Sequence, residues 1–297
     1  MVCYNGAESE RKKEENMSKI VFLDVDGTLI DYSAQCPDSA KEAVEKARAN
    51  GHKVYICTGC SKAEIEQRDL PELDGMIGGN GAYVEDDGVV VMHQGLSKED
   101  VKHIVDWCND RHLGFYLEAN SGMYANDYMK EQGPAVMFQY GTGKGADEMT
   151  AKESAAHFVN GFIYLDGEDL YRDDVNKISF ILSDYQDHLD SKEEFPHLIA
   201  NTWGGKGEHA LFGDLGPTGI TKKHAIEVLL DHLDADQKDT ISFGDAKIDL
   251  SMFELCDYNV AMGNGGTEIK EAADYITDDV NEDGLYNAFV HLGLIEE

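Results

Sequence analysis

The sequence predicts an α/β protein: a doubly wound parallel sheet interrupted by an inserted α+β domain. Near both ends of the chain, short apolar runs alternate with amphipathic helical segments, as in βαβ units. In the middle third, β-prone runs instead meet in pairs at turn signals, as in antiparallel sheets. At roughly 150 residues per domain, a chain of 297 residues has room for both parts.

The N-terminal alternation follows a polar tail, residues 1–17. The apolar runs Lys19–Val25 and Lys53–Thr58 predict buried strands. A helix is expected between them over residues 39–51, where Gly51 closes it, and another over residues 61–69.

The middle of the chain changes character after Gly78. A hairpin is expected to turn at Asp87-Gly88, and a helix to cover residues 97–114. Residues 130–160 show no pattern that predicts an element. The strands expected here are residues 115–120, 123–127, 176–183, 197–203 and 208–215.

The alternating pattern resumes from Thr218. Helices are expected over residues 221–233, 248–255 and 267–273 and after Asp283, and strands over residues 240–244, 258–262 and 275–277. We therefore predict a core formed by residues 18–82 and 212–297, split by an inserted domain at residues 83–211.

The composition excludes some function classes. Lys plus Arg number 25 and Asp plus Glu number 58, a net charge of −33 that disfavours binding to nucleic-acid backbones and anionic lipids. No apolar run reaches the roughly 18 residues of a membrane span. Six cysteines are sparse for a disulfide framework, and the N-terminus has no secretory apolar region. These features favour the cytoplasm.

Acidic side chains follow two of the predicted core strands. Asp24 and Asp26 follow the first strand, Asp245 and Asp249 follow the strand at 240–244, and Thr58 ends the second. Because the carboxyl ends of parallel strands meet at one edge of a sheet, these groups are expected to converge. Clustered carboxylates repel one another unless a cation neutralises them, and such oxygen ligands suit Mg²⁺.

Four motifs in this order resemble those of the haloacid dehalogenase-like phosphatases: DVDGTL at 24–29, the strand end at Thr58, Lys222 in GITKKHAI, and GDAKID at 244–249. The chain is similar within that superfamily to the Cof-type sugar-phosphatase-like branch, through NGAYVEDDG, Lys177 in NKISFI, AMGNGG and EDGLYNAF. The resemblance runs from Lys19 to the C-terminus. It implies a Rossmann-like core and a large α/β cap that determines substrate specificity.

The resemblance also implies roles for individual residues. Asp24 would be the nucleophile, forming an aspartyl-phosphate, and Asp26 would be the general acid and base. Thr58 and Lys222 would hold the phosphoryl oxygens. The other residues assigned to the phosphate site are Gly27, Gly59 and Asn264. Mg²⁺ would be held by Asp24, the Asp26 carbonyl oxygen and Asp245, with Asp249 as a ligand or a partner of the ligands.

Two positions depart from the family pattern. The second motif commonly reads TGR, but Cys60 stands in place of the arginine. The fourth commonly reads GDxxND, but Ile248 stands in place of the asparagine. Losing a partner that orients metal ligands typically reduces affinity or activity about 10–100-fold. We expect a slow or narrow phosphatase acting on a small phosphorylated metabolite such as a sugar phosphate, as a monomer or homodimer.

Three alternatives remain open from the sequence. A similarly capped relative uses the same nucleophile motif for phosphosugar mutase chemistry. A weakened member of the family would bind a phosphorylated ligand without turnover. Cys57 and Cys60 form a Cys-x-x-Cys pair, which is either a redox pair or a buried strand cysteine beside an unrelated loop cysteine. Lys206 is the nearest basic candidate for a distal anion.

Overall fold

The computed structural model describes residues 18–205 and 207–296, which form two compact units. The first comprises residues 18–58, 68–92 and 221–296, and the second comprises residues 59–67 and 93–220. The predicted tail (residues 1–17) and Lys206 lie outside the described residues. Each unit has its own sheet.

The first unit is built on an eight-stranded sheet. Its strands are, across the sheet, β14 (Tyr275–Ile276), β13 (Tyr258–Ala261), β12 (Thr240–Gly244), β1 (Ile20–Leu23), β2 (Lys53–Cys57), β3 (Gly75–Gly78), β4 (Tyr83–Asp86) and β5 (Val89–His93). The strands from β14 to β3 are parallel, and β4 runs antiparallel to β3. Every residue of β1 and β12 is buried, which explains why both read as continuous apolar runs.

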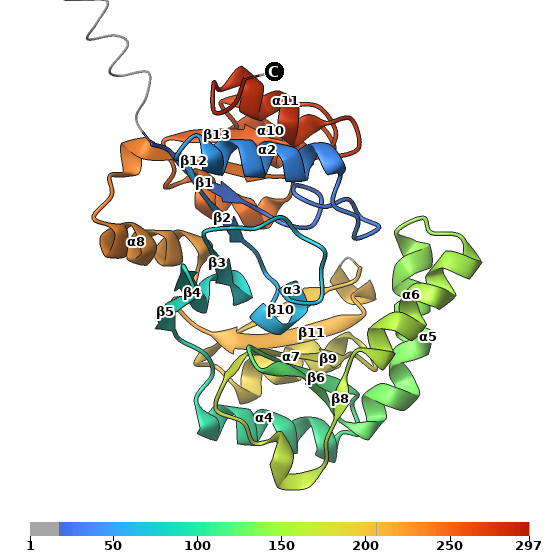
Figure 1. The fold of residues 1–297 in the computed structure, drawn as a ribbon. Helices are drawn as coiled ribbons and strands as arrows, with labels where there is room; N and C mark the ends of the chain where they lie inside the picture. The colour runs from blue at the N-terminus through green and yellow to red at the C-terminus, as the bar shows by residue number, and fades with distance from the viewer. Residues whose placement is uncertain (1–17, 206, 297) are drawn as a thin grey trace, which may run out of the picture. The chain divides into compact units, whose positions relative to one another are not determined.

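Helices cover both faces of this sheet (Figure 1). α2 (Asp38–Ala49) and α11 (Gly284–His291) pack together on one face. α8 (Lys222–Leu233), α9 (Leu250–Phe253) and α10 (Thr267–Ala272) share an apolar cluster with side chains from β1 and β2 on the other face. The predicted doubly wound α/β core is therefore confirmed.

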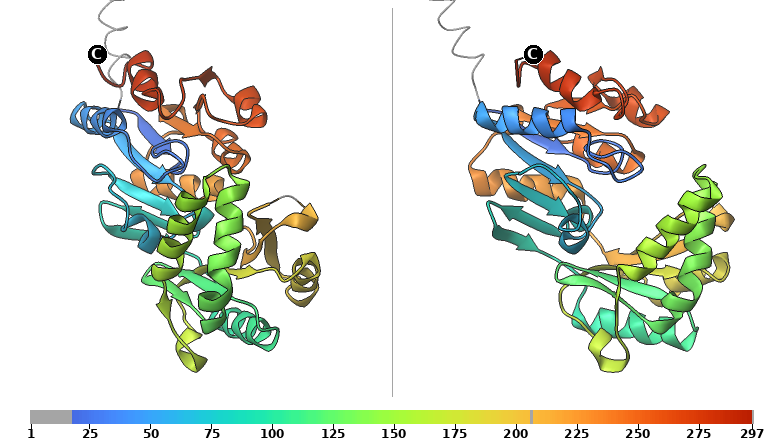
Figure 2. Two further views of the ribbon diagram at one scale, coloured as in Figure 1. Left: turned by 90° about the vertical axis from the view of Figure 1, so that its right-hand side faces the viewer. Right: turned by 45° about the vertical axis from the view of Figure 1, so that its right-hand side comes forward.

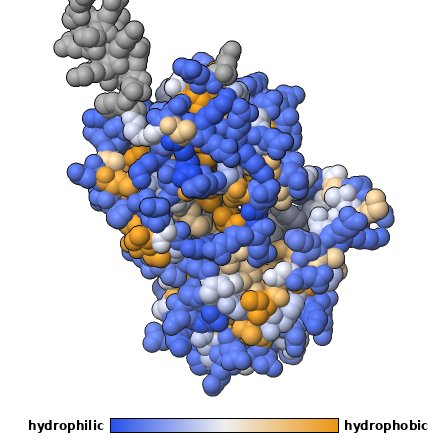
Figure 3. All heavy atoms as spheres, viewed as in Figure 1, coloured by the Kyte–Doolittle hydropathy of each residue, from blue (hydrophilic) through white to orange (hydrophobic). Residues whose placement is uncertain are grey.

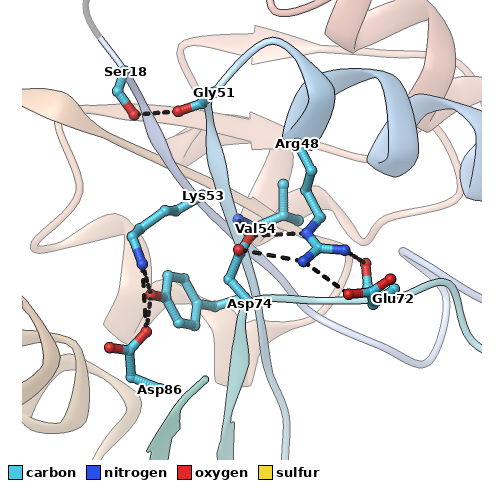
Figure 4. Close-up of polar contacts among 9 residues, drawn as sticks. Ser18, Arg48, Gly51, Lys53, Val54, Glu72, Asp74 and Asp86 are labelled. Atoms are coloured by element: carbon cyan, nitrogen blue, oxygen red, sulfur yellow. Dashed lines mark hydrogen bonds and ion pairs between the residues drawn. The ribbon is translucent and has the colours of Figure 1, made fainter. Parts of the chain in front are cut away.

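Hydrogen bonds and ion pairs link neighbouring elements at the amino ends of the strands in the first unit (Figure 4). Asp74 accepts hydrogen bonds from Arg48 Nε at 3.1 Å and from the Val54 N–H at 2.8 Å, joining the end of α2 to β2. Tyr55 donates to Asp86 Oδ1 at 2.6 Å, joining β2 to β4. These contacts lie at the amino ends of the parallel strands, whereas the predicted site lies at their carboxyl ends.

The second unit is built on a six-stranded sheet. Its strands are, across the sheet, β10 (Leu198–Trp203), β11 (Phe212–Pro217), β9 (Val175–Ile181), β6 (Phe115–Ala119), β7 (Gly122–Ala125) and β8 (Ile163–Tyr164). Neighbours are antiparallel, except that β7 and β8 are parallel. α4 (Lys98–Asp110) packs against one face, and α7 (Tyr185–Glu194) contacts β10 and β11. The predicted α+β character of this part is confirmed.

Residues 130–160, for which the sequence predicted no element, lie in two helices, α5 (Asp127–Gly143) and α6 (Glu148–Asn160). These helices run side by side in both views of Figure 2. A Cβ atom on Gly133 would lie 3.1 Å from Val159, and one on Gly141 would lie 3.1 Å from Ala151. The glycines that obscured the helical pattern thus permit close packing, which outweighs their low helix propensity.

The unit boundaries differ from those predicted. Residues 83–92 extend the sheet of the first unit through β4 and β5, whereas β11 pairs with β9 and β10 in the second. Residues 59–67 also belong to the second unit, because α3 (Lys62–Ile65) contacts β6 and β7. α3 is shorter than the helix predicted over 61–69.

The surface is largely hydrophilic. Hydrophilic residues cover most of the face visible in Figure 3. Among residues 18–205 and 207–296, no helix has both the length and the apolar character needed to cross a membrane.

Candidate active site

The predicted site residues of the first unit gather at the carboxyl ends of its central strands. Asp24 follows β1, Thr58 follows β2 and Asp245 follows β12. β1 pairs with β2 on one side and β12 on the other, so the strand order reverses at β1. Open α/β sheets bind ligands at such a reversal, outside the carboxyl ends of the strands.

Lys222 connects two of the acidic residues. Its Nζ donates to Asp24 Oδ1 at 2.7 Å and to Asp249 Oδ1 at 2.6 Å. Lys222 is the first residue of α8, and Thr221 caps this helix by accepting the His224 N–H at 3.1 Å. The Lys222 side chain is only 1% exposed, so this is a buried three-residue ion cluster rather than a solvated helix face.

Asp249 is held on both of its carboxylate oxygens. Oδ1 accepts from Lys222, and Oδ2 accepts the backbone N–H groups of Asp245 at 3.2 Å and Ala246 at 3.1 Å. With both oxygens engaged by protein donors, Asp249 orients Lys222 and the loop that carries Asp245.

Burial governs the electrostatics of this cluster. Burial raises the pKa of Asp24 to about 8; Lys222 opposes the rise, and the Asp249 and Asp245 carboxylates add to it. Burial also disfavours the charged Lys222 ammonium, but Asp24 and Asp249 outweigh this and raise its pKa well above the usual range. Three carboxylates share one ammonium, so the cluster has an excess of negative charge that a cation would offset.

The residues present fit a hard divalent cation. Each of Asp24, Asp245 and Asp249 offers an oxygen within 4.8 Å of those of the other two. Asp245 Oδ1 is buried and accepts no hydrogen bond from the part of the chain that the structure describes, so it is available as a ligand atom. Burial raises the pKa of Asp245 to about 6. An all-oxygen donor set of this kind suits Mg²⁺.

The loop after β1 approaches Asp245 closely at Gly27. Gly27 has φ +89°, and a Cβ atom there would lie 2.5 Å from Asp245 Oδ2. Asn264 braces this loop by donating to the Gly27 carbonyl at 2.7 Å, while its own Oδ1 accepts the Val280 N–H at 2.9 Å. Both polar ends of the Asn264 side chain are therefore engaged within the protein, which places it in a supporting role for the loop.

Asp26 lies apart from the buried cluster. Its side chain is half exposed, and Arg68 Nη1 donates to its Oδ1 at 2.7 Å. No sequence pattern indicated Arg68, because the residue lies in an irregular segment after α3 and belongs to no motif. Its guanidinium nevertheless supplies a cation to the first unit, whose second motif lacks the expected arginine at Cys60.

Backbone hydrogen bonds hold Thr58 at the carboxyl end of β2. Thr58 is buried; its N–H donates to the Ile77 carbonyl at 2.9 Å, and its own carbonyl accepts the Asn80 N–H at 3.0 Å. Gly59 and Cys60 belong to the second unit.

Cys57 is buried in β2, and burial raises the pKa of its thiol well above the usual range, so it is not an activated thiolate. A buried thiol of this kind gives no support to a redox role for Cys57.

Lys177 belongs to a separate polar cluster on β9 of the second unit. Its Nζ lies 3.2 Å from Glu118 Oε2, and Ser179 donates to Glu118 Oε1 at 2.9 Å. Burial raises the pKa of Glu118 to about 7, although Lys177 opposes the rise.

Comparisons with known proteins identify the family of the chain. The model of the haloacid dehalogenase-like hydrolase family matches residues 21–289. A Bacillus subtilis (strain 168) protein named "Putative phosphatase YkrA" is 28% identical over 283 residues, which cover 94% of this chain and 99% of that protein.

Solved structures extend the similarity to the fold. A hypothetical protein from Geobacillus kaustophilus HTA426 superposes with a TM-score of 0.79 at 26% identity, covering 94% of this chain and 100% of that one. The HAD subclass IIB sugar phosphatase BT4131 superposes with a TM-score of 0.70, also at 26% identity and with the same coverage. Because the family match spans nearly the whole described chain, this protein belongs to the haloacid dehalogenase-like hydrolases.

Proposed function

We propose that this protein is a Mg²⁺-dependent phosphatase that hydrolyses a small phosphorylated metabolite, foremost a sugar phosphate, through an aspartyl-phosphate on Asp24. The observation that carries the proposal is the buried Lys222 bridge between Asp24 and Asp249. A lysine fixed beside a carboxylate at the strand ends supplies a point charge that a phosphoryl group can share. If these acids were solvated residues of a turn, water would stabilise their charges, and no buried lysine would be expected between them.

The proposed reaction has two steps. In the first, an Asp24 oxygen bonds to phosphorus while the bond to the leaving-group oxygen breaks, and Asp26 gives that oxygen its proton. In the second, the Asp26 carboxylate takes a proton from water as the water oxygen attacks phosphorus. The bond between Asp24 and phosphorus then breaks, which releases phosphate and restores the carboxylate.

The remaining site residues bind and orient. Thr58 and Lys222 would hold the phosphoryl oxygens, with Gly27 allowing the backbone to come close. Gly59 follows Thr58 as a further proposed backbone contact. Arg68 would orient Asp26 toward the leaving group.

Asp24, Asp245 and the Asp26 carbonyl oxygen would hold Mg²⁺. When bound, this ion supplies the positive charge that lets a carboxylate and a phosphate approach each other. The engagement of both Asp249 oxygens supports a positioning role for that residue rather than direct ligation.

The substrate class rests on similarity. The solved relative BT4131 is described as a sugar phosphatase, which supports a sugar phosphate as the first substrate to test. The cytoplasmic location, the monomeric or homodimeric state and a specificity role for the second unit stay predictions.

The experiment is a phosphate-release assay on hexose phosphates, pentose phosphates and p-nitrophenyl phosphate. Each substrate is tested with Mg²⁺, with EDTA, and with the Asp24→Asn variant. Asp69→Asn is the matched control, because Asp69 is an exposed carboxylate of the same unit that pairs with Lys41.

Release that requires Mg²⁺ and Asp24 but not Asp69 would support the proposal, and the panel would rank substrates. Release that persists in Asp24→Asn would contradict the nucleophile assignment. Binding of a sugar phosphate without release, in folded protein with Mg²⁺, would contradict turnover and favour the ligand-binding alternative.

A further inference from the structure

Tyr32 contacts the proposed metal carboxylate, although no sequence motif includes it. Its hydroxyl donates a hydrogen bond to Asp245 Oδ2. Tyr32 lies in the loop between β1 and α2, and most of its surface is exposed. Water could have satisfied the hydroxyl of such an exposed tyrosine. Its contact with a buried carboxylate therefore indicates a specific role.

The Tyr32 hydroxyl is itself oriented by Asn264. The Asn264 amide nitrogen lies 3.4 Å from the Tyr32 oxygen and 2.7 Å from the Gly27 carbonyl oxygen. Asn264 is fixed at its other end by the Val280 N–H. A phenol has one hydrogen to donate, and it is protonated at neutral pH. When its oxygen accepts from Asn264, that hydrogen is left for Asp245.

The two oxygens of Asp245 are therefore in different situations. Oδ2 accepts from Tyr32, whereas Oδ1 is buried and has no partner among the described residues. Ile248, three residues further on, is apolar and exposed and can donate no side-chain hydrogen bond. Among residues 18–205 and 207–296, Tyr32 is the side chain that donates to this carboxylate.

We propose that Tyr32 is a positioning residue for the metal site: its hydroxyl fixes Asp245 Oδ2 and so leaves Oδ1 directed at the cation. This inference rests on the proposed function, because it takes Asp245 as a Mg²⁺ ligand. Asn264 forms the outer part of the same chain of contacts, which links the loop at Gly27 to the loop at Asp245.

The test compares Tyr32→Phe with the unaltered protein. The melting temperature is measured over a series of Mg²⁺ concentrations without substrate, and its rise yields the Mg²⁺ dissociation constant. The expected result is a dissociation constant about 10–100-fold higher in Tyr32→Phe. Phosphate release by Tyr32→Phe is expected to require a correspondingly higher Mg²⁺ concentration for half-maximal rate.

Tyr286→Phe is the matched control. Tyr286 lies on α11, and its hydroxyl accepts from Lys46 at 2.9 Å, so removing it is expected to leave Mg²⁺ affinity unchanged. An equal loss in both variants would overturn the inference, because the effect would then be general.

Two further outcomes separate this inference from the proposed function. If the unaltered protein binds Mg²⁺ and releases phosphate, but Tyr32→Phe binds Mg²⁺ equally or more tightly, the positioning role is wrong and the phosphatase proposal stands. Tighter binding would mean that the phenol competes with the cation for Asp245. If the unaltered protein shows neither Mg²⁺ stabilisation nor phosphate release, both proposals are overturned.

Discussion

Replacing Lys222 by methionine tests how the buried cluster is held together. Lys222→Met keeps a long side chain of similar shape but removes the charge between Asp24 and Asp249. Asp249 then loses the cation that pairs with it in the protein interior. The first unit is therefore expected to lose stability as well as activity.

The magnitude follows from the geometry. Lys222 Nζ lies 2.6 Å from Asp249 Oδ1, and both side chains are at most 1% exposed, so removing the lysine leaves a buried carboxylate without its cation. Breaking a buried ion pair on one side typically reduces stability by about 3–5 kcal/mol. The free energy of unfolding is thus expected to fall by about 3–5 kcal/mol.

Urea unfolding in EDTA measures this loss, because no divalent cation then replaces the missing charge. Trp107 and Trp203 both lie in the second unit, so tryptophan fluorescence follows that unit, whereas circular dichroism follows both. The loss is expected in the unfolding curve followed by circular dichroism, which includes the first unit.

Lys223→Met is the matched control on the same helix. The Lys223 Nζ is 3.6 Å from Glu254 and its side chain is 40% exposed, so its loss is expected to change stability by at most about 1 kcal/mol. A change in Lys222→Met no larger than in this control would refute the reasoning that the buried cluster depends on its lysine.

Three further predictions concern other parts of the first unit. Asp86→Asn is expected to lower the free energy of unfolding by about 1 kcal/mol at neutral pH, because Asp86 accepts the Tyr55 hydroxyl at 2.6 Å. Burial opposes ionisation of Asp86, but hydrogen bonds from Tyr55 and nearby cations outweigh it and lower the pKa of Asp86 below 3.8. The stability difference between the two proteins is therefore fully present above that pH and disappears as the pH falls through the lower pKa of the folded state. Urea unfolding curves that differ equally at all pH values would contradict this. Arg68→Gln is expected to lower kcat about 10–100-fold with little change in melting temperature, because the half-exposed Asp26 loses a cation that helps to orient it. An unchanged kcat would remove Arg68 from the site. Gly81→Ala is expected to destabilise the protein by more than about 1 kcal/mol in thermal unfolding, because φ is +107° and the added Cβ would lie 2.3 Å from the backbone oxygen that precedes α8. A melting temperature equal to that of the unaltered protein would show that this backbone moves aside freely.

Much of the site could be predicted because strand ends follow simple rules. Asp24, Thr58 and Asp245 each come directly after an apolar run, and parallel strands bring their carboxyl ends to one edge. Lys222 is different: 198 residues separate it from Asp24, and only the family resemblance indicated that they would meet. Its position depends on the packing of α8 against the sheet, which no local pattern encodes.

Contacts made by irregular segments could not be predicted. Tyr32 and Arg68 lie outside helices and strands, and their partners are set by the paths of two loops rather than by a period of two or 3.6 residues. Residues 83–92, which the sequence predicted as the start of the inserted domain, instead extend the sheet of the first unit. A hairpin that extends a parallel sheet has the same local pattern as one that begins a separate domain.

The assignment of residues 59–67 to the second unit bears on how such proteins recombine. The chain passes between the units after Thr58, Gln67, Met92 and Ile220, so the second unit is encoded by two separate stretches. A chimera that exchanged only residues 93–220 with a relative would leave α3 against strands that had not evolved with it. Exchanging both stretches together would keep α3 with its own β6 and β7.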